Sequence, residues 1–200
     1  MKRGFTLIEM LVVMGIIAGL LGAGVAAYSS AVRSAQRARG VELVQNLQAA
    51  LTESLQKKDA WMPALLAEGA GGNGKATKEV GACLAKLGVF SFGRVENDVV
   101  ELTDVEKLGI LSPWGEAAAM SRIAKVGVSD GTKVPSGGTI GDHRLRFAID
   151  DDYDGRTKVS VEGGVPATVR ASACVWCCGY DGKFGTKDDI FSWAKDQEVK

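Results

Sequence analysis

An uncharged run from Met10 to Tyr28 constrains what this chain can fold into more than any other feature of its sequence. Together with residues 5–8 it is long enough, at about 1.5 Å per residue, to cross a hydrocarbon core of about 30 Å as a helix. One acid, Glu9, interrupts the stretch, and an acid within an apolar span is costly. A plain membrane anchor leaves this acid unexplained. Two basic residues before the span and three after it leave its orientation open.

The opening of the chain allows an ordinary secretory signal, because Gly24 and Ala26 offer a small-residue cleavage site after the apolar run. That interpretation does not account for Glu9. The segment GFTLIE at residues 4–9 stands at the start of the chain and leads into an apolar helix. It closely resembles the type IV prepilin motif, which is shared by pilins and by the pseudopilins of type II secretion.

The resemblance implies a set of processing and assembly residues. A dedicated prepilin peptidase of the inner membrane would cut between Gly4 and Phe5 and then methylate the new amino group of Phe5. Glu9 would pair with the amino terminus of a neighbouring subunit inside a helical filament. In an apolar helical bundle an unpaired carboxylate is expensive and a paired one is tolerable. We therefore expect Glu9 to penalise a wrong register during assembly.

Beyond the span, the sequence predicts an α+β, pilin-like fold. Val44, Leu47, Leu51 and Leu55 recur at three- and four-residue steps, so the helix should continue as an amphipathic half. This long N-terminal helix is expected to pack on a head with a small antiparallel β-sheet. We predict five segments: a leader at 1–4, a transmembrane and assembly helix at 5–28, the amphipathic half of the helix at 29–60, a variable loop and helix insertion at 61–143, and the antiparallel sheet with a C-terminal acidic loop at 144–200.

Local patterns predict the elements of the head. Val80 and Leu84 share a face of a short helix, and a strand pair is possible around Asn97-Asp98. Alternation at 144–149 predicts a half-buried strand, with a turn at Asp154-Gly155 and a returning partner at 158–161. A third strand is expected at 169–178. The segment SPWG at 112–115 resembles the Asp-Pro-Trp-Gly turn that precedes the sheet in major pseudopilins, with serine replacing aspartate.

Residues 179–190 resemble the calcium loop near the C-terminus of major pseudopilins. The resemblance makes Asp181, Asp188 and Asp189 the side-chain ligands, with loop carbonyls completing the six to eight oxygens that calcium prefers. The family more often separates its last two acids by a residue and has a slightly longer loop, so it is open whether both adjacent acids reach one ion. A solvated acidic turn is the alternative.

A second acidic run, at residues 150–155, matches the first half of an EF-hand loop. Counting from Asp150, the twelfth position falls on Val161, where an EF-hand needs glutamate, and no helix pattern flanks the run. We therefore interpret this segment as a hairpin turn between two strands, one that would hold calcium at most loosely.

The four cysteines are Cys83, Cys174, Cys177 and Cys178. Cys174 and Cys178 would lie roughly 13 Å apart in a straight strand, beyond the limit of about 7 Å for a disulfide, and adjacent Cys177 and Cys178 would need a strained link. Cys83 is therefore the expected partner of one of the late cysteines in an oxidising periplasm. Buried thiols remain an open alternative, and a zinc site built from all four is a more distant one.

Composition argues against catalysis and nucleic-acid binding. The one histidine, His143, lies in a polar loop, where we expect it to be solvent-exposed, and no nucleophile motif accompanies it. The formal net charge is zero, which gives no electrostatic reason to expect nucleic acid as a partner.

These features together predict a structural protein with no enzymatic activity. Its nearest resemblance is to the major pseudopilin of type II secretion, which implies a single inner-membrane span with the head in the periplasm. The implied partners are further copies in a homo-oligomeric helical filament, other pseudopilins, the prepilin peptidase and the inner-membrane secretion platform. A type IV pilin subunit used for adhesion, motility or DNA uptake is the alternative. A membrane-tethered periplasmic metal or thiol protein is the third.

Overall fold

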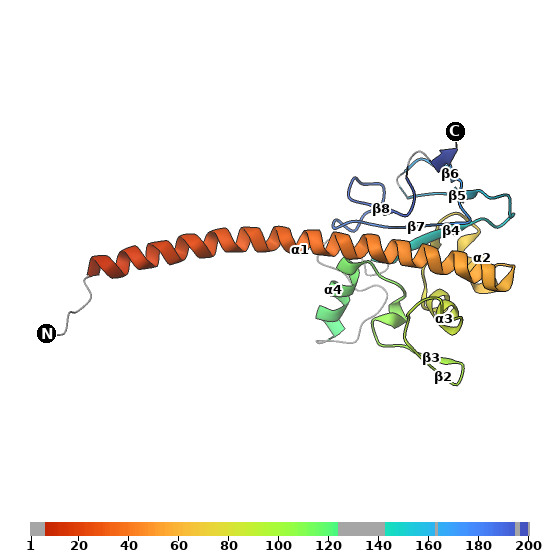
Figure 1. Cartoon of the computed structure of the whole chain (residues 1–200), viewed down its shortest axis with the longest axis horizontal. Coiled ribbons are helices and arrows are strands. Elements are labelled where there is room, and N and C mark those ends of the chain that lie inside the picture. The colour runs from red at the N-terminus through yellow and green to blue at the C-terminus, as the bar shows by residue number, and fades with distance from the viewer. Residues whose placement is uncertain (1–6, 124–142, 163, 195–196, 200) are drawn as a thin grey trace. The chain divides into compact units, whose positions relative to one another are not determined.

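The computed structural model of the chain describes residues 7–123, 143–162, 164–194 and 197–199 (Figure 1). It divides into two compact units, Met1–Ala38 and Arg39–Lys200. Helix α1 (Leu7–Lys58) begins in the first unit and ends in the second, so the predicted long N-terminal helix is confirmed. All described strands are antiparallel and belong to the second unit, which makes the fold α+β and pilin-like, as predicted.

In the N-terminal unit, α1 carries large apolar side chains on all sides. From Leu7 to Leu21 they are between 47% and 84% exposed. By length and composition this helix is able to cross a membrane, and it is the one helix in the described part of the chain that meets this test. A helix that is apolar all round has no polar side to turn toward water. This part of α1 therefore requires lipid or other helices around it.

In the second unit, α1 buries one face and exposes the other. Val44, Leu47 and Leu51 are fully buried, at the spacing that the sequence predicts. The helix ends at Lys58, and Asp59 turns the chain with a φ of 53°. The amphipathic half of the helix thus supplies one wall of the main core.

The remaining helices and strands surround this half of α1. In Figure 1 the β-sheets lie on one side of it, and α3, α4 and a small hairpin lie on the other. The shorter helical elements are α2 (Pro63–Gly69), α3 (Lys78–Lys86), the 3-10 turn η1 (Glu106–Leu108) and α4 (Pro113–Ile123). Val80 and Leu84 of α3 are fully buried, as predicted from their spacing.

The main sheet has four strands in the order β1-β4-β7-β8, and its central pair is the most buried part of the molecule. Its strands are β1 (Gly74–Lys75), β4 (Arg146–Ile149), β7 (Ala173–Cys177) and β8 (Ile190–Phe191). A second sheet has the order β5-β6-β9, with β5 (Thr157–Val159), β6 (Ala167–Val169) and β9 (Glu198–Val199). An exposed hairpin pairs β2 (Arg94–Glu96) with β3 (Val99–Glu101). Its turn residues Asn97 and Asp98 both have positive φ, as a two-residue hairpin turn of type I′ requires.

Two strand predictions were wrong, one in its pairing and one in its extent. The strand at 144–149 does not pair with the one at 158–161: β4 pairs with β1 and β7, and β5 pairs with β6. The Asp154-Gly155 turn therefore connects two different sheets. The single strand expected at 169–178 is two strands, β6 and β7, because the chain turns between Val169 and Ala173 to change sheets.

The prediction of the SPWG segment as a turn was also wrong. Pro113 begins α4, since proline suits the first helical position. Ser112 precedes it, accepting a hydrogen bond from Glu116 N at its carbonyl (3.0 Å) and from Gly115 N at its hydroxyl (3.4 Å). These bonds satisfy N–H groups of the first turn that would otherwise lack partners. The segment thus starts a helix.

Candidate functional site

The first candidate site is the start of α1. Gly4 and Phe5 lie outside the described residues, and Glu9 lies in the first turn of the helix. An acid at this position complements the positive end of the helix dipole. Its neighbours Ile8 and Met10 are 70% and 53% exposed, so the acid sits in an apolar surface that has no cover from its own chain. Soluble proteins rarely expose apolar area on this scale, which marks the surface for contact with lipid or with other helices.

The second candidate site is the C-terminal acidic loop, where Asp188 accepts hydrogen bonds from the loop itself. Asp181 N donates to Asp188 Oδ2 at 3.3 Å, and the Thr186 hydroxyl donates to Asp188 Oδ1. Gly179 makes room for this carboxylate, because a Cβ there would lie 2.0 Å from Asp188 Oδ2. Burial works to raise the pKa of Asp188, but the hydrogen bonds from Thr186 and from backbone N–H groups hold it below its usual value.

Asp189 and Asp181 accept hydrogen bonds from other backbone N–H groups of the same loop, and the Thr186 hydroxyl also lies 3.3 Å from Asp189 Oδ1. Asp189 is 6% exposed, and its Oδ2 accepts hydrogen bonds from Gly185 N at 2.7 Å and from Thr186 N at 3.2 Å. Burial raises the pKa of Asp189 against the effect of these bonds. Asp181 Oδ1 accepts a bond from Lys183 N at 2.9 Å. The three predicted calcium ligands thus face three different sets of N–H donors.

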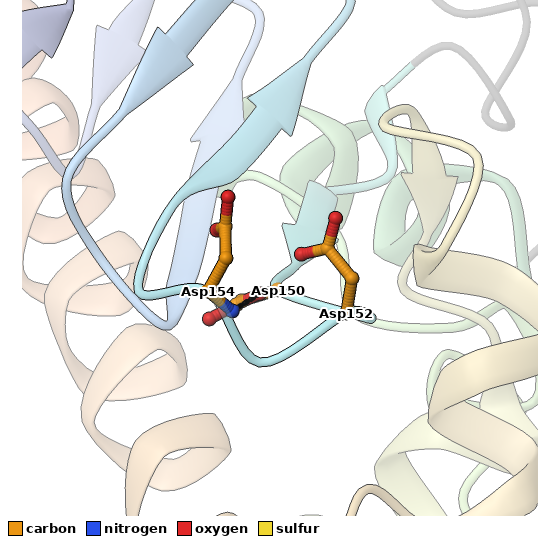
Figure 2. A group of neighbouring side chains, drawn as sticks. All are labelled: Asp150, Asp152 and Asp154. Atoms are coloured by element: carbon orange, nitrogen blue, oxygen red, sulfur yellow. Dashed lines mark hydrogen bonds between the residues drawn. The ribbon is translucent and has the colours of Figure 1, made fainter.

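One group of three carboxylates does converge among the described residues, and it lies in the other acidic loop. Oxygens of Asp150, Asp152 and Asp154 all lie within 4.8 Å of one another (Figure 2). Asp181, Asp188 and Asp189 form no such group in the described part of the chain. The C-terminal loop as it stands therefore does not fit a calcium ion, and the predicted site there stays a prediction.

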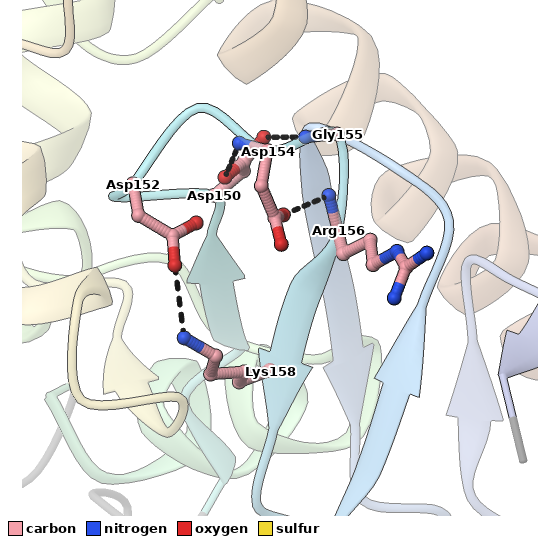
Figure 3. A network of polar contacts seen from close by, with 6 residues as sticks. All are labelled: Asp150, Asp152, Asp154, Gly155, Arg156 and Lys158. Atoms are coloured by element: carbon pink, nitrogen blue, oxygen red, sulfur yellow. Dashed lines mark hydrogen bonds and ion pairs between the residues drawn. The ribbon is translucent and has the colours of Figure 1, made fainter.

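The Asp150 loop is also closed by its own hydrogen bonds, as Figure 3 shows. Asp150 is 5% exposed and accepts bonds from Asp154 N (3.1 Å) and Gly155 N (2.8 Å). Burial raises the pKa of Asp150, and the neighbouring carboxyl of Asp152 raises it further. The Lys158 ammonium lies 3.0 Å from Asp152 and lowers the pKa of that exposed carboxyl. Of the three converging acids, Asp152 is thus the one with an ion pair to Lys158 of β5 in the described residues.

Comparison with known proteins shows to which family this chain belongs. The family described as Prokaryotic N-terminal methylation motif matches residues 1–25, which include the GFTLIE segment. The chain is 30% identical over 127 residues to the type IV major fimbrial protein FimA of Dichelobacter nodosus, covering 63% of this chain and 75% of that protein. The chain belongs to the type IV prepilin family. No solved structure matches it.

The cysteines of this prepilin are reduced in the structure. No disulfide joins the four of them, all of which lie in described segments. Cys83 Sγ lies 3.4 Å from Met62 Sδ, so the disulfide expected for Cys83 is not formed here. Burial raises the pKa of Cys174 to about 12 and also raises the pKa of Cys177. Such thiols are poor nucleophiles, and no converging group of cysteines that would hold zinc occurs in the described residues.

The prediction that His143 is solvent-exposed was wrong. The side chain is 1% exposed, and its Nδ1 lies 3.3 Å from Ser112 Oγ and 3.5 Å from Cys178 Sγ. Ser112 N also donates to His143 O at 2.8 Å, so the two residues close the base of the segment between them. The polar residues before His143 suggested an exposed position. The burial of His143 depends instead on Ser112 and Cys178, which lie far from it in the sequence. The buried position gives the histidine no access to a substrate.

Proposed function

We propose that this prepilin is a structural subunit of a type II secretion pseudopilus, without enzymatic activity. Its head would face the periplasm, and α1 would hold it in the inner membrane until it joins the filament. The observation that supports assembly through α1 is the position of Glu9, in the first turn of a helix whose apolar side chains are 47% to 84% exposed from Leu7 to Leu21. A surface of this kind is stable only when lipid or neighbouring helices cover it.

The assembly step would depend on the electrostatics of Glu9 inside a bundle of helices that excludes water. Cleavage after Gly4 by the prepilin peptidase leaves a methylated amino group on Phe5, a cation close to Glu9 of an adjacent copy. Pairing with a cation removes much of the cost of a buried carboxylate, and a subunit in the wrong register leaves that cost in place. The pair thus favours one axial position of each subunit. The remaining partners would be other pseudopilins and the inner-membrane secretion platform.

Two measurements test this proposal. Mass spectrometry of the mature protein should find a chain that begins with N-methylated Phe5. Glu9→Leu should insert in the membrane at the parent level but fail to form filaments, because no carboxylate meets the amino terminus. Glu42→Gln, which removes an exposed acid from the head half of the same helix, is the matched control and should assemble normally. Filaments of Glu9→Leu with normal length and yield would overturn the proposal.

A type IV pilin is the second candidate, favoured by the similarity to a fimbrial protein. Pilins commonly close a C-terminal loop with a disulfide, and here an acidic loop without a disulfide stands near the C-terminus. That difference supports the pseudopilin. Deletion of the gene separates the two: loss of a pseudopilin leaves secreted proteins in the periplasm, whereas loss of a pilin removes long surface filaments.

Calcium at Asp181, Asp188 and Asp189 remains a proposal carried by the family resemblance. The carboxylates do not converge in this structure, so it supplies no coordination geometry for the ion. Thermal melting with calcium and with a chelator tests it, using Asp181→Asn as the variant. A bound ion would stabilise the parent and have no effect on the variant. Equal melting of the parent in both conditions would remove calcium from this loop.

A further inference from the structure

A row of polar side chains follows the apolar part of α1 on one face of the helix. Ser29, Arg33 and Arg37 succeed one another at four-residue steps, and this spacing places side chains side by side. All three are exposed. No acid occurs between Met10 and Val41, so this length of helix carries a local positive charge.

The distance of this row from the apolar span matches the lipid headgroup layer. From Leu7 to Tyr28 the helix rises about 32 Å, close to the hydrocarbon thickness of about 30 Å. Headgroups add roughly 5–7 Å on each side. Arg33, about 7 Å beyond Tyr28 along the axis, falls in that layer. The backbone of Arg37 lies about 13 Å beyond Tyr28, about 6 Å outside this layer, and a long arginine side chain is able to reach back toward it.

The third arginine of this region differs from the other two. Arg39 belongs to the head unit, directly before the buried Gly40. Its charge acts on Glu116 of α4, where it lowers a pKa that burial raises. Arg39 therefore has an acid of the head nearby, and Arg33 and Arg37 are the two arginines of this region that belong to the N-terminal unit.

We propose that Arg33 and Arg37 bind the phosphate groups of anionic phospholipids in the leaflet next to the head. A guanidinium offers a planar fork of donors that matches phosphate oxygens, and charge-assisted bonds of this type are the strong ones. The proposal depends on membrane insertion of α1 but not on which kind of filament the subunit joins. It assigns the pair a role in the unassembled subunit, where headgroups hold the depth of the helix in the bilayer.

The expected size of the effect is measurable. A basic side chain near an anionic membrane surface gains a factor of about five in affinity, so the pair should contribute roughly 25-fold at low salt. Screening shortens the electrostatic range to about 3 Å at 1 M salt, so most of this preference should disappear there.

The experiment uses the full chain, purified in a neutral detergent and titrated with dioleoyl phosphatidylglycerol or dioleoyl phosphatidylcholine, with bound lipid counted by native mass spectrometry. The parent should retain phosphatidylglycerol preferentially. Arg33→Gln with Arg37→Gln should lose roughly 25-fold in apparent affinity for it at low salt. Arg94→Gln with Arg170→Gln removes the same charge from exposed positions on the head and should match the parent.

A second double variant separates the effect of the positive charge from the effect of the guanidinium geometry. Arg33→Lys with Arg37→Lys keeps the charge and should retain most of the preference for phosphatidylglycerol. Equal retention of the two lipids by the parent would overturn the proposal, as would parent-level retention of phosphatidylglycerol by the double glutamine variant. A glutamine variant that keeps the lipid but fails to form filaments would also overturn it and assign the arginines to contact with a second copy. All readouts except that last one use unassembled chain, so they are independent of the Glu9→Leu test.

Discussion

The two acidic loops of the head use similar residues in different ways. Both are rich in aspartate and contain glycine, and both satisfy buried carboxylates with their own backbone N–H groups. In the Asp150 loop the carboxylates converge and one lysine lies beside them. In the C-terminal loop Asp188 and Asp189 accept hydrogen bonds from different backbone N–H groups and share only the Thr186 hydroxyl among the donors described, and the loop closes over the Asp188 carboxylate at Gly179. Sequence similarity between acidic turns thus says little about where their oxygens point.

The largest expected effect on stability comes from replacing Gly179, which leaves room for the Asp188 side chain. In Gly179→Ala the new Cβ would lie 2.0 Å from Asp188 Oδ2, so the whole Asp188 side chain must move and lose its hydrogen bonds. We expect a loss of about 3 kcal/mol in the free energy of unfolding. Urea denaturation of the full chain in detergent measures it through tryptophan fluorescence, because all four tryptophans lie in the head. Gly71→Ala, where a Cβ meets nothing within 4 Å, is the control and should be near neutral.

Asp189→Ala should have the next largest effect. The carboxylate is 6% exposed and accepts two backbone N–H bonds at one oxygen. Alanine removes this acceptor and leaves the two N–H groups without it, and we expect a loss of about 2 kcal/mol by the same urea measurement. A stability equal to that of the parent would show that the C-terminal loop does not depend on this acceptor.

In the Asp150 loop the glycine has a different role, which gives a smaller effect. Gly155 has a φ of +80° and open space around its Cα. Gly155→Ala should therefore cost about 1 kcal/mol, from the left-handed backbone alone. A loss as large as that of Gly179→Ala would contradict this distinction, in which Gly179 leaves room for a neighbouring side chain and Gly155 adopts a left-handed backbone.

The pH dependence of stability should differ between Asp188 and Asp189. Because the pKa of Asp188 is lowered on folding, its contribution is full above its ordinary value of 3.8 and is lost as the pH falls through the folded value. The raised pKa of Asp189 has the opposite sign: its ionisation opposes folding at neutral pH, and this cost is relieved as the pH falls toward the ordinary value. Urea midpoints between pH 3 and pH 7 should therefore show Asp188→Asn with less acid destabilisation than the parent, and Asp189→Asn with less acid stabilisation.

The smallest effect is expected for the ion pair of the Asp150 loop. Lys158 and Asp152 are 3.0 Å apart with side chains 70% and 48% exposed, and water and salt screen such pairs. Lys158→Met should leave the urea midpoint unchanged within error at 0.15 M salt. A clear shift would mean that the converged acids need this cation to coexist.

The long elements of the fold could be predicted because their signals are local. The three- and four-residue spacing of Val44, Leu47 and Leu51 is a property of one helix, and so is that of Val80 and Leu84 in α3. The hairpin at Asn97-Asp98 rests on two residue types that tolerate positive φ. Each of these patterns is read within a few residues of chain.

The features that were missed depend on contacts between distant segments. The pairing of β4 with β7 instead of β5 is decided by side chains far apart in the sequence. The burial of His143 follows from Ser112 and Cys178, which no pattern around residue 143 reveals. The orientation of Asp188 depends on Gly179 and Thr186, so the composition of the loop identified its acids without indicating what they bind.

The backbone contact between Ser112 and His143 joins two segments of the head that lie far apart in the sequence. Ser112 N donates a hydrogen bond to His143 O, and the strand bridge between Leu111 and Arg144 continues that contact. Because loop-closure entropy grows only slowly with length, such a joint tolerates longer or shorter replacements at small thermodynamic cost. We therefore expect an epitope or a fluorophore tag inserted between Ile123 and His143 to be tolerated, while α4, both sheets and the helix core keep their sequence.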